Sequence, residues 1–268
     1  MTVSHASRTL SALAVRARSV RPPRWWQEIG FIAIVYFLYS MVRNAVPAHE
    51  IGAFHRARII LSMERWAHID FEHALNQFVA REHWLAYICN YYYSTLHFVV
   101  TIGVLVWLYV KHPLRYRSIR SVLLITNVVA LIGFWFLAVA PPRMLHGFID
   151  TVVRFHTWGS LASPGLAKAS NQFAAMPSLH IGWSLWCGLA IVTLARRRWV
   201  RMLGALYPLA TLFVIVGTAN HFVLDAVGGA ATLGLAVLVQ RLVSGRSTYR
   251  STTIVLPDLA PAPELANA

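Results

Sequence analysis

Residues 222–243 read FVLDAVGGAATLGLAVLVQRLV, a run of 22 mostly apolar residues with a single acid, Asp225, close to its beginning. A helix needs about 20 such residues to cross the hydrocarbon core of a bilayer. Similar runs occupy residues 27–46, 84–110, 119–140, 179–195 and 201–219. With 57% hydrophobic and only 13% charged residues, the 268-residue chain also lies outside the composition range of soluble globular proteins. These runs predict an all-α, polytopic membrane protein, built as a bundle of six transmembrane helices.

The stretch between the first two runs, residues 53–82, has a different pattern. Apolar residues such as Ile60 and Trp66 recur at helical spacing among charged ones such as Arg56 and Glu64. This pattern is typical of a helix that lies along the membrane interface with its apolar face in the headgroup region. A helical hairpin outside the membrane, packed on the bundle, is the alternative.

The distribution of cations predicts the orientation. The chain has 24 Lys and Arg against 10 Asp and Glu, an excess also found in nucleic-acid-binding proteins. Here the cations cluster between the apolar runs: 16 of the 24 lie before the first run, after the second, after the fourth and around the end of the sixth. Because cytoplasmic connections are enriched in Lys and Arg, we expect a multi-pass cell-membrane protein with both termini cytoplasmic and no nucleic-acid partner.

Three regions follow from this topology. Residues 1–25 carry five Arg and no apolar run of signal-peptide length, which predicts a basic cytoplasmic segment before a retained first helix. Residues 26–243 form the six-helix membrane domain, and residues 244–268, rich in Pro and small residues, read as a disordered cytoplasmic tail. The two cysteines, Cys89 and Cys187, lie inside apolar runs, which excludes a disulfide scaffold and a Cys-based zinc site.

With this orientation, polar residues from separate segments fall at the same, extracytoplasmic, ends of the helices. Arg143 follows the third run, Ser178 and His180 open the fourth, and Asn220 and His221 open the sixth. We therefore expect one site at this membrane face, assembled from several helices.

Asp225 is the most informative single residue. A carboxylate in an apolar run costs several kcal/mol unless a partner compensates it. His221 stands four residues earlier, on the same helical face. An ionised Asp225 that accepts a hydrogen bond from one ring nitrogen of His221 would fix its tautomer and leave the other nitrogen free, as in a catalytic triad. A purely structural His and Asp pair is the alternative.

His180 gains meaning from its neighbours. Pro177 and Ser178 suit a helix start, where a serine cap and free backbone N–H groups create an anion site. Arg143 could clamp a phosphate held there through its planar guanidinium, although it could also anchor the helix end at the interface.

Two histidines, a carboxylate, a guanidinium and a helix N-terminus suit phosphoryl transfer, in which catalysis is mostly positioning and charge stabilisation. One imidazole can attack phosphorus while the other protonates the departing oxygen. A zinc site made of His180, His221 and Asp225 would leave no base. We therefore expect a metal-independent reaction without a cofactor.

The segments Ala175-Met176-Pro177-Ser178-Leu179-His180 and His221-Phe222-Val223-Leu224-Asp225, whose histidines are 41 residues apart, resemble the motifs of the phosphatidic acid phosphatase type 2 superfamily. The likeness looks closest to its inositolphosphotransferase-like branch, which includes the inositol phosphorylceramide synthases. Glu64, Asn90 to His97 and the Pro141-Pro142-Arg143 turn add to it.

The resemblance implies a six-helix catalytic domain and assigns roles to its residues. His221 would be the nucleophile that forms a phosphohistidine, Asp225 would orient it, and His180 would act as acid toward the leaving group. Ser178 and Arg143 would bind the phosphate, with Asn220 beside them. The expected partners are a membrane lipid substrate and a lipid alcohol or water as acceptor.

The chain departs from the superfamily pattern in its cations. The usual Lys-x6-Arg-Pro motif is absent, Ile215 stands where an Arg usually precedes the nucleophilic His, and Leu179 replaces a glycine. Two fewer cations favour a phosphodiester donor over a more highly charged phosphomonoester. His146, Arg154 or Lys168 could supply the missing charge.

Two other functions stay open. One is a plain lipid phosphatase that acts on polyprenyl or diacylglycerol phosphates. The other is a non-enzymatic channel, transporter or scaffold that uses Asp225 and the histidines for proton relay or helix pairing. Tyr93 and His97, inside the second run, are expected to hydrogen-bond between helices, with headgroup recognition as the alternative.

Overall fold

The computed structural model of the chain describes residues 23–45, 50–157, 171–245 and 248–249, and the regular secondary structure in them is helical. A single isolated bridge, between Val139 and Ala174, is the only extended pairing in these residues. The predicted all-α class is therefore confirmed. The elements are α2 (Trp25–Ala45), α3 (Glu50–Trp66), α4 (Glu72–Arg81), α5 (His83–Tyr91), the π-helical turn η1 (Tyr92–Leu96), α6 (His97–Lys111), α7 (Pro113–Phe136), the 3₁₀ turn η2 (Pro142–Met144), α8 (Thr151–Arg154), α10 (Leu179–Leu194), α11 (Arg198–Gly217) and α12 (Val223–Ser244).

Five helical segments of the described chain are long and apolar enough to cross a membrane. They are Trp25–Ala45, His83–Lys111, Pro113–Phe136, Arg198–Gly217 and Val223–Ser244. The remaining predicted span forms α10, which is apolar but has only 16 residues. At 1.5 Å per residue it covers about 24 Å, less than the roughly 30 Å hydrocarbon core. Five of the six predicted spans thus meet the length criterion.

The third predicted span, 119–140, differs most at its ends. The helix α7 begins at Pro113, because proline is well accommodated in the first turn, where its missing N–H is not needed. It ends at Phe136, and in the non-helical segment that follows, Val139 donates a backbone hydrogen bond to the Phe173 carbonyl (2.8 Å). That pairing brings the segment after α7 beside the segment that leads into α10.

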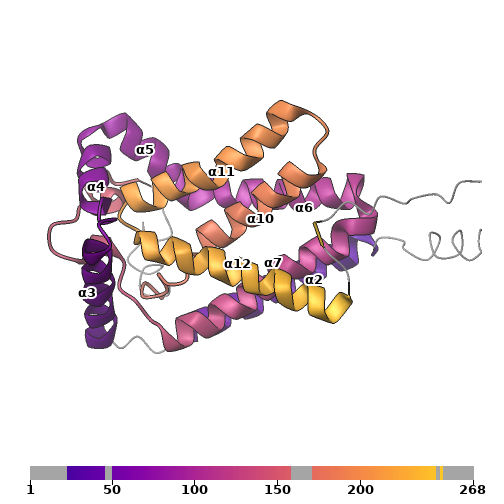
Figure 1. The fold of residues 1–268 in the computed structure, drawn as a ribbon, viewed down its shortest axis with the longest axis horizontal. Coiled ribbons are helices and arrows are strands. Elements are labelled where there is room, and N and C mark those ends of the chain that lie inside the picture. Colours follow the sequence, from indigo (N-terminus) through magenta and orange to yellow (C-terminus); the bar gives the residue numbers. More distant parts are fainter. Residues whose placement is uncertain (1–22, 46–49, 158–170, 246–247, 250–268) are drawn as a thin grey trace, which may run out of the picture.

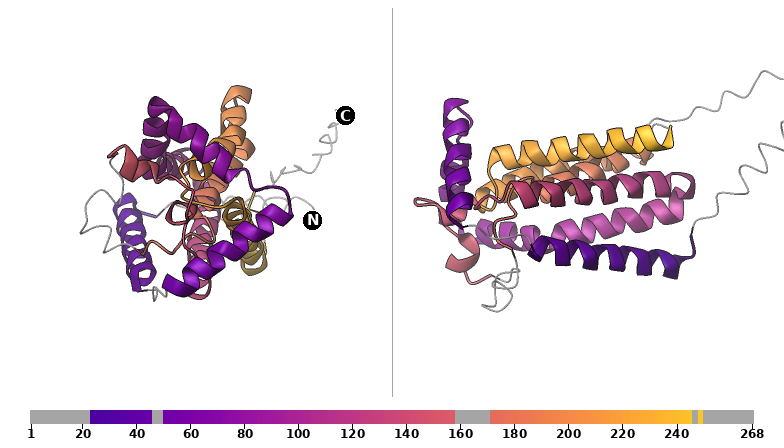
Figure 2. Two further views of the ribbon diagram at one scale, coloured as in Figure 1. Left: turned by 90° about the vertical axis from the view of Figure 1, so that its left-hand side faces the viewer. Right: turned by 90° about the horizontal axis from the view of Figure 1, so that it is seen from below.

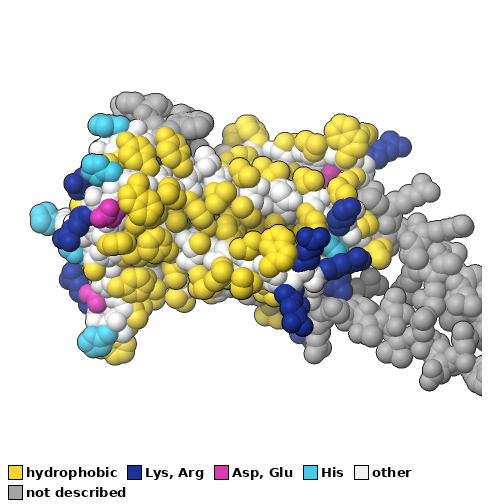
Figure 3. Space-filling model, turned by 90° about the horizontal axis from the view of Figure 1, so that it is seen from above, with side chains coloured by type: hydrophobic (Ala, Val, Ile, Leu, Met, Phe, Trp, Pro, Cys, Tyr) yellow, Lys and Arg dark blue, Asp and Glu magenta, His cyan; other side chains and the backbone are white. Residues whose placement is uncertain are grey.

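The long helices run side by side, and α3 and α4 lie across one end of the bundle (Figures 1 and 2). The short helix α10 packs against α6, α7, α11 and α12. On the face drawn in Figure 3, apolar side chains cover the middle of the molecule, and Lys and Arg gather toward its two ends. An apolar girdle between charged ends is the surface expected of a chain that crosses a bilayer.

The stretch predicted to lie at the interface forms α3 and α4. One face of α3, with Ala53, Ala57 and Ile60, is buried against the bundle. On the other face Ile51 and Trp66 are exposed, at 91% and 85%. The prediction that this face contacts lipid headgroups remains a prediction.

At the opposite end of the bundle, Pro23, just before α2, is hydrogen-bonded to α6, and α12 is hydrogen-bonded to α7. The Tyr109 hydroxyl donates to the Pro23 carbonyl (2.7 Å), and the Gln240 amide donates to the Ser118 hydroxyl (2.6 Å). The start of α2 and the end of α12 therefore lie at the end that also carries the connection between α6 and α7 (Figure 1). The predicted segment 1–25 and tail 244–268 lie almost entirely outside the described residues.

The starts of α10 and α12 are in direct backbone contact. The Ser178 N–H donates to the Asp225 carbonyl (2.9 Å). On the next turn of α12, a Cβ at Gly229 would overlap the Ser178 carbonyl oxygen. Only a glycine at this position lets the two helix starts approach so closely.

We expect Gly229→Ala to lower the free energy of unfolding by about 1–3 kcal/mol, because the added methyl group meets backbone atoms that cannot rotate away. Gly234→Ala, on the same helix but facing open space, is the matched control and should leave stability unchanged or raise it by up to ~1 kcal/mol. Thermal unfolding in detergent measures both. Equal melting temperatures for wild type and Gly229→Ala would contradict the close contact.

Candidate active site

The turn between α11 and α12 presents Asn220 and His221. The backbone N–H groups of both residues donate to the Ile215 carbonyl, at 3.0 and 3.1 Å. Ala219, just before them, has φ +53°, a conformation that non-glycine residues rarely adopt. The chain is thus held in a tight turn that points these two residues into the bundle end.

Asp225 is fully buried in the first turn of α12. Its Oδ2 accepts the Phe222 N–H (2.9 Å), as in a capping box, and lies 3.4 Å from Nδ1 of His221. The contact with the imidazole is long, as catalytic hydrogen bonds often are before substrate binds. It occupies Nδ1 and leaves Nε2 of His221 available for chemistry.

His180 lies in the first turn of α10, with its ring centroid 5.5 Å from that of His221. Its ring stacks on Tyr93 (4.2 Å, 19° between planes) and lies 4.4 Å from the ring of His97. Tyr93 belongs to the π-helical turn η1, and His97 is the first residue after that turn. A π-helical turn rotates the residues beyond it relative to a regular helix, and such turns recur at functional sites. Here Tyr93 and His97 hold the His180 ring in place.

Arg143 is fixed by partners on either side. Its backbone N–H donates to the Ala219 carbonyl (2.8 Å), and its Nη1 donates to Oδ1 of Asn220 (2.5 Å). Its Nε lies 3.4 Å from Oδ2 of Asp150. The guanidinium is therefore oriented within the protein, and its charge is partly balanced by an acid.

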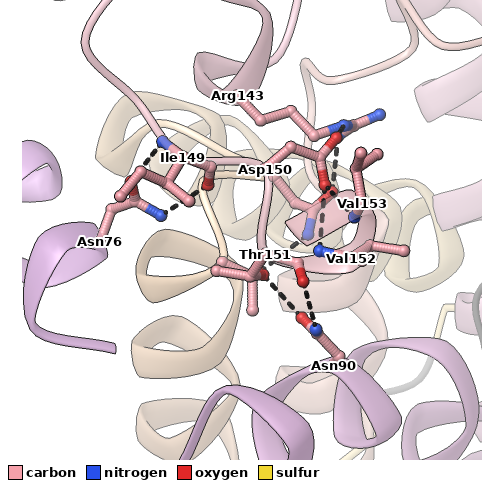
Figure 4. A network of polar contacts seen from close by, with 10 residues as sticks. Asn76, Asn90, Arg143, Ile149, Asp150, Thr151, Val152 and Val153 are labelled. Carbon is pink, nitrogen blue, oxygen red and sulfur yellow. Dashed lines mark hydrogen bonds and ion pairs between the residues drawn. The ribbon is translucent and has the colours of Figure 1, made fainter. Parts of the chain in front are cut away.

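Figure 4 shows the polar network behind this arginine. The other carboxylate oxygen of Asp150 accepts the N–H groups of Val152 and Val153, at 3.0 and 3.1 Å, and so caps α8. The Thr151 hydroxyl donates to Oδ1 of Asn90 (2.7 Å). These bonds tie the connection after η2 to the helix that carries Tyr93, which fixes the position of Asp150.

A cavity of about 100 Å³ lies where these elements meet. It is smaller than the 300–1,000 Å³ of ordinary small-molecule pockets and is of the size of a phosphate group. The side chains around it include Arg43, Tyr93, Arg143, His180, Asn220 and His221. The two predicted histidines, the predicted arginine and Asn220 therefore share one cavity.

Ser178 is placed differently from the other predicted residues. It is the N-cap residue of α10, as expected of a helix start, but its hydroxyl makes no capping hydrogen bond. The side chain is fully buried, has no hydrogen-bond partner among the described residues and does not line the cavity. The structure places Ser178 at the backbone contact between α10 and α12, beside the cavity.

The candidates for the missing positive charge also lie elsewhere. His146 and Arg154 do not line the cavity, and Lys168 lies outside the described residues. Arg43, from the last turn of α2, lines it instead. The sequence offered one signal for this residue, its position at the outer end of the first apolar run.

Two buried acids, one from α3 and one from α4, accept hydrogen bonds from backbone N–H groups in the first turn of α12. Oε1 of Glu64 accepts the Leu224 N–H (2.7 Å), and Oε1 of Glu72 accepts the Val223 N–H (3.2 Å). Helix starts leave such N–H groups without partners inside the helix. Both carboxyl groups are completely buried. They fasten the helix that carries Asp225 to the layer formed by α3 and α4.

Burial raises the pKa of Glu64 to about 9, and the hydrogen bond and charge of Glu72 and the charge of Asp225 add to this effect. A protonated Glu64 can donate to Glu72, since the Oε2 atoms of both acids have no other hydrogen-bond partner in the described part of the chain.

This shift has a consequence for stability. An unfolded Glu ionises near pH 4.3, whereas folded Glu64 keeps its proton up to about pH 9, so stability should fall as pH rises between these values. In Glu64→Gln, the side-chain amide does not titrate. Its oxygen can accept the Leu224 N–H and its NH₂ group can donate to Glu72 at any pH in this range. The melting temperature of this variant relative to wild type should therefore increase from pH 5 to pH 8.5.

The matched control is Glu50→Gln, an exposed acid on the same helix. Its melting temperature relative to wild type should stay level over the same range. A level difference for Glu64→Gln as well would contradict a protonated Glu64 in the folded protein.

The described residues contain no group of three or more His, Cys, Asp and Glu arranged to hold a metal ion. A model of the PAP2 superfamily, the phosphatidic acid phosphatase type 2 proteins, matches residues 58–239. The matched part runs from α3 to α12 and contains Arg143, His180, His221 and Asp225. No curated protein and no solved structure matches the chain.

Proposed function

The chain belongs to the PAP2 superfamily, and we propose on that premise that it is a membrane phosphotransferase or phosphatase acting on a phosphate-linked lipid headgroup. The observation that carries the proposal is the shared cavity of His180 and His221, whose ring centroids are 5.5 Å apart. Two imidazoles so placed can act on the two sides of one phosphorus atom.

In the first step, Nε2 of His221 attacks phosphorus and the bond from phosphorus to the leaving oxygen breaks. His180 gives its proton to that oxygen, so that a neutral alcohol or lipid leaves. Asp225 accepts the Nδ1–H of His221 and stabilises the positive charge that develops on the ring as the phosphohistidine forms. Arg143, held by Asn220, binds the phosphate oxygens.

In the second step, an acceptor hydroxyl from a lipid alcohol or from water gives its proton to His180. The acceptor oxygen attacks phosphorus, the bond from phosphorus to nitrogen breaks, and His221 is regenerated as a neutral imidazole. The scheme uses no metal and no cofactor. Ser178 contributes by fixing His180, its neighbour, against α12.

The charge of the site favours a phosphodiester donor, as in inositolphosphotransferases. Arg143 is partly neutralised by Asp150, 3.4 Å away, and Ile215 stands at the position of a further superfamily arginine. A phosphodiester carries one negative charge and needs less compensation than a phosphomonoester, the substrate of a plain lipid phosphatase.

The proposal includes an orientation. The cavity is lined by His180, at the start of α10, and by His221, just before α12. The start of α12 lies at the bundle end with α3 and α4, away from the cation-rich connection between α6 and α7 (Figure 1). By the enrichment of cations on the cytoplasmic side, the site is extracytoplasmic and both termini are cytoplasmic in the cell membrane. α10 is then the sixth crossing, and α3 lies along the headgroup layer with Ile51 and Trp66 toward lipid.

The direct test replaces His221 by Asn in the purified protein, supplied with mixed lipids and assayed by mass spectrometry. We expect turnover to fall by roughly 10⁴-fold or more, since the attacking group is gone. His55→Asn, at an exposed position on α3, is the matched control and should keep wild-type turnover.

A new headgroup lipid identifies a transferase, and free phosphate or phospho-headgroup identifies a hydrolase. Surviving turnover in His221→Asn would remove the residue from the nucleophile role, and an inactive wild type would favour a scaffold.

A further inference from the structure

Arg143 alone does not supply the positive charge that phosphoryl transfer usually requires. Charge on the phosphate oxygens is commonly held by two or more cationic groups. Two guanidinium groups line the described part of the cavity, those of Arg43 and Arg143. Arg143 is already engaged by Asp150 and Asn220. Phosphate binding therefore calls for a second cation that no acid already engages, and Arg43 is the candidate.

Arg43 lies at the cavity and has N–H donors available for this role. It lies in the last turn of α2, one turn after Tyr39, which lines the same cavity. Its Nη2 donates to the Asn171 carbonyl (3.3 Å), and its own carbonyl accepts from the Asn171 side-chain amide (3.2 Å). This exchange fastens the end of α2 to the segment that leads into α10 and so fixes the guanidinium at the cavity wall.

The charge of Arg43 is not balanced by an acid in the described part of the chain. The ion pairs found there involve Arg65, Arg120, Arg143 and His221. A guanidinium has five N–H donors in a planar fork that matches phosphate oxygens, and the contact with Asn171 uses a single nitrogen. Donors remain for an anionic ligand in the cavity.

We propose that Arg43 is the second phosphate-binding cation of this site, supplied by the first helix in place of the arginine absent at Ile215. The inference rests on the proposed function and deepens it, because it names the group that completes the binding of the substrate phosphoryl unit. Residue 43 precedes the part of the chain matched by the superfamily model, residues 58–239. The first helix is thus part of the site as well as an anchor.

A structural role for Arg43, as a tether for Asn171, is separable from phosphate binding. Arg43→Gln keeps an amide that can donate to the Asn171 carbonyl and removes the charge. Arg43→Lys keeps the charge and loses the fork. Arg81→Gln, exposed at the end of α4 and outside the cavity, is the matched control.

The experiment measures three quantities for these variants in the full-length purified protein: the KM of the lipid donor, the inhibition constant of orthovanadate as a phosphate mimic, and the melting temperature. Hydrogen bonds to charged groups are strong enough that we expect Arg43→Gln to raise both constants by roughly tenfold or more. Arg43→Lys should raise them by a smaller factor. The melting temperatures, and all values for Arg81→Gln, should match wild type.

Wild-type turnover combined with unchanged KM and orthovanadate inhibition in Arg43→Gln would overturn the inference and leave the proposed function intact. Equal losses in Arg43→Gln and Arg43→Lys, together with lower melting temperatures, would show a tether and also overturn it. If Arg43→Gln does not fold, unaltered orthovanadate inhibition in Arg43→Lys would overturn it. A wild-type protein that neither turns over lipid nor binds orthovanadate would remove the proposed function and this inference with it.

Discussion

The site depends on the backbone contact between the starts of two helices. The hydrogen bond from the Ser178 N–H to the Asp225 carbonyl (2.9 Å) joins α10 to the first turn of α12. Each of these residues is close in sequence to one of the two histidines, so this contact fixes the distance between the imidazoles. Gly229 permits it by leaving room for the Ser178 carbonyl. Protein interiors resist such displacements because they are closely packed.

Three buried carboxyl groups hold the helix that carries the nucleophile candidate. Asp225, Glu72 and Glu64 accept the consecutive N–H groups of residues 222, 223 and 224. These carboxyl oxygens supply acceptors for N–H groups that a helix start leaves without partners inside the helix. The bonds of Glu64 and Glu72 connect the helix to α3 and α4, which lie across the bundle end (Figure 2). These buried acids fix the first turn of α12 and so fix the position of His221, the residue just before that turn.

Local patterns predicted the helices and the pairing of His221 with Asp225, because hydropathy and a four-residue spacing are properties of short segments. The shared cavity followed from the common membrane face expected for both histidines. Contacts between residues far apart in the sequence could not be predicted from such local patterns. Glu64 and its partner Leu224 are 160 residues apart, Glu72 and Val223 are 151 residues apart, and Arg43 and Asn171 are 128 residues apart. The serine cap at Ser178 was expected from local preference, but its hydroxyl makes no capping bond, since the tertiary contact with α12 sets the position of that residue.

In the proposed mechanism, His180 and His221 act on the two sides of one phosphorus atom. An experimental structure with orthovanadate tests this claim most directly, because vanadate adopts the five-coordinate geometry of in-line transfer. We expect vanadium bonded to Nε2 of His221, with the opposite apical oxygen within hydrogen-bonding distance of His180 and equatorial oxygens facing Arg143. Vanadate bound away from His221, or with His180 and His221 on the same side of the vanadium, would contradict it.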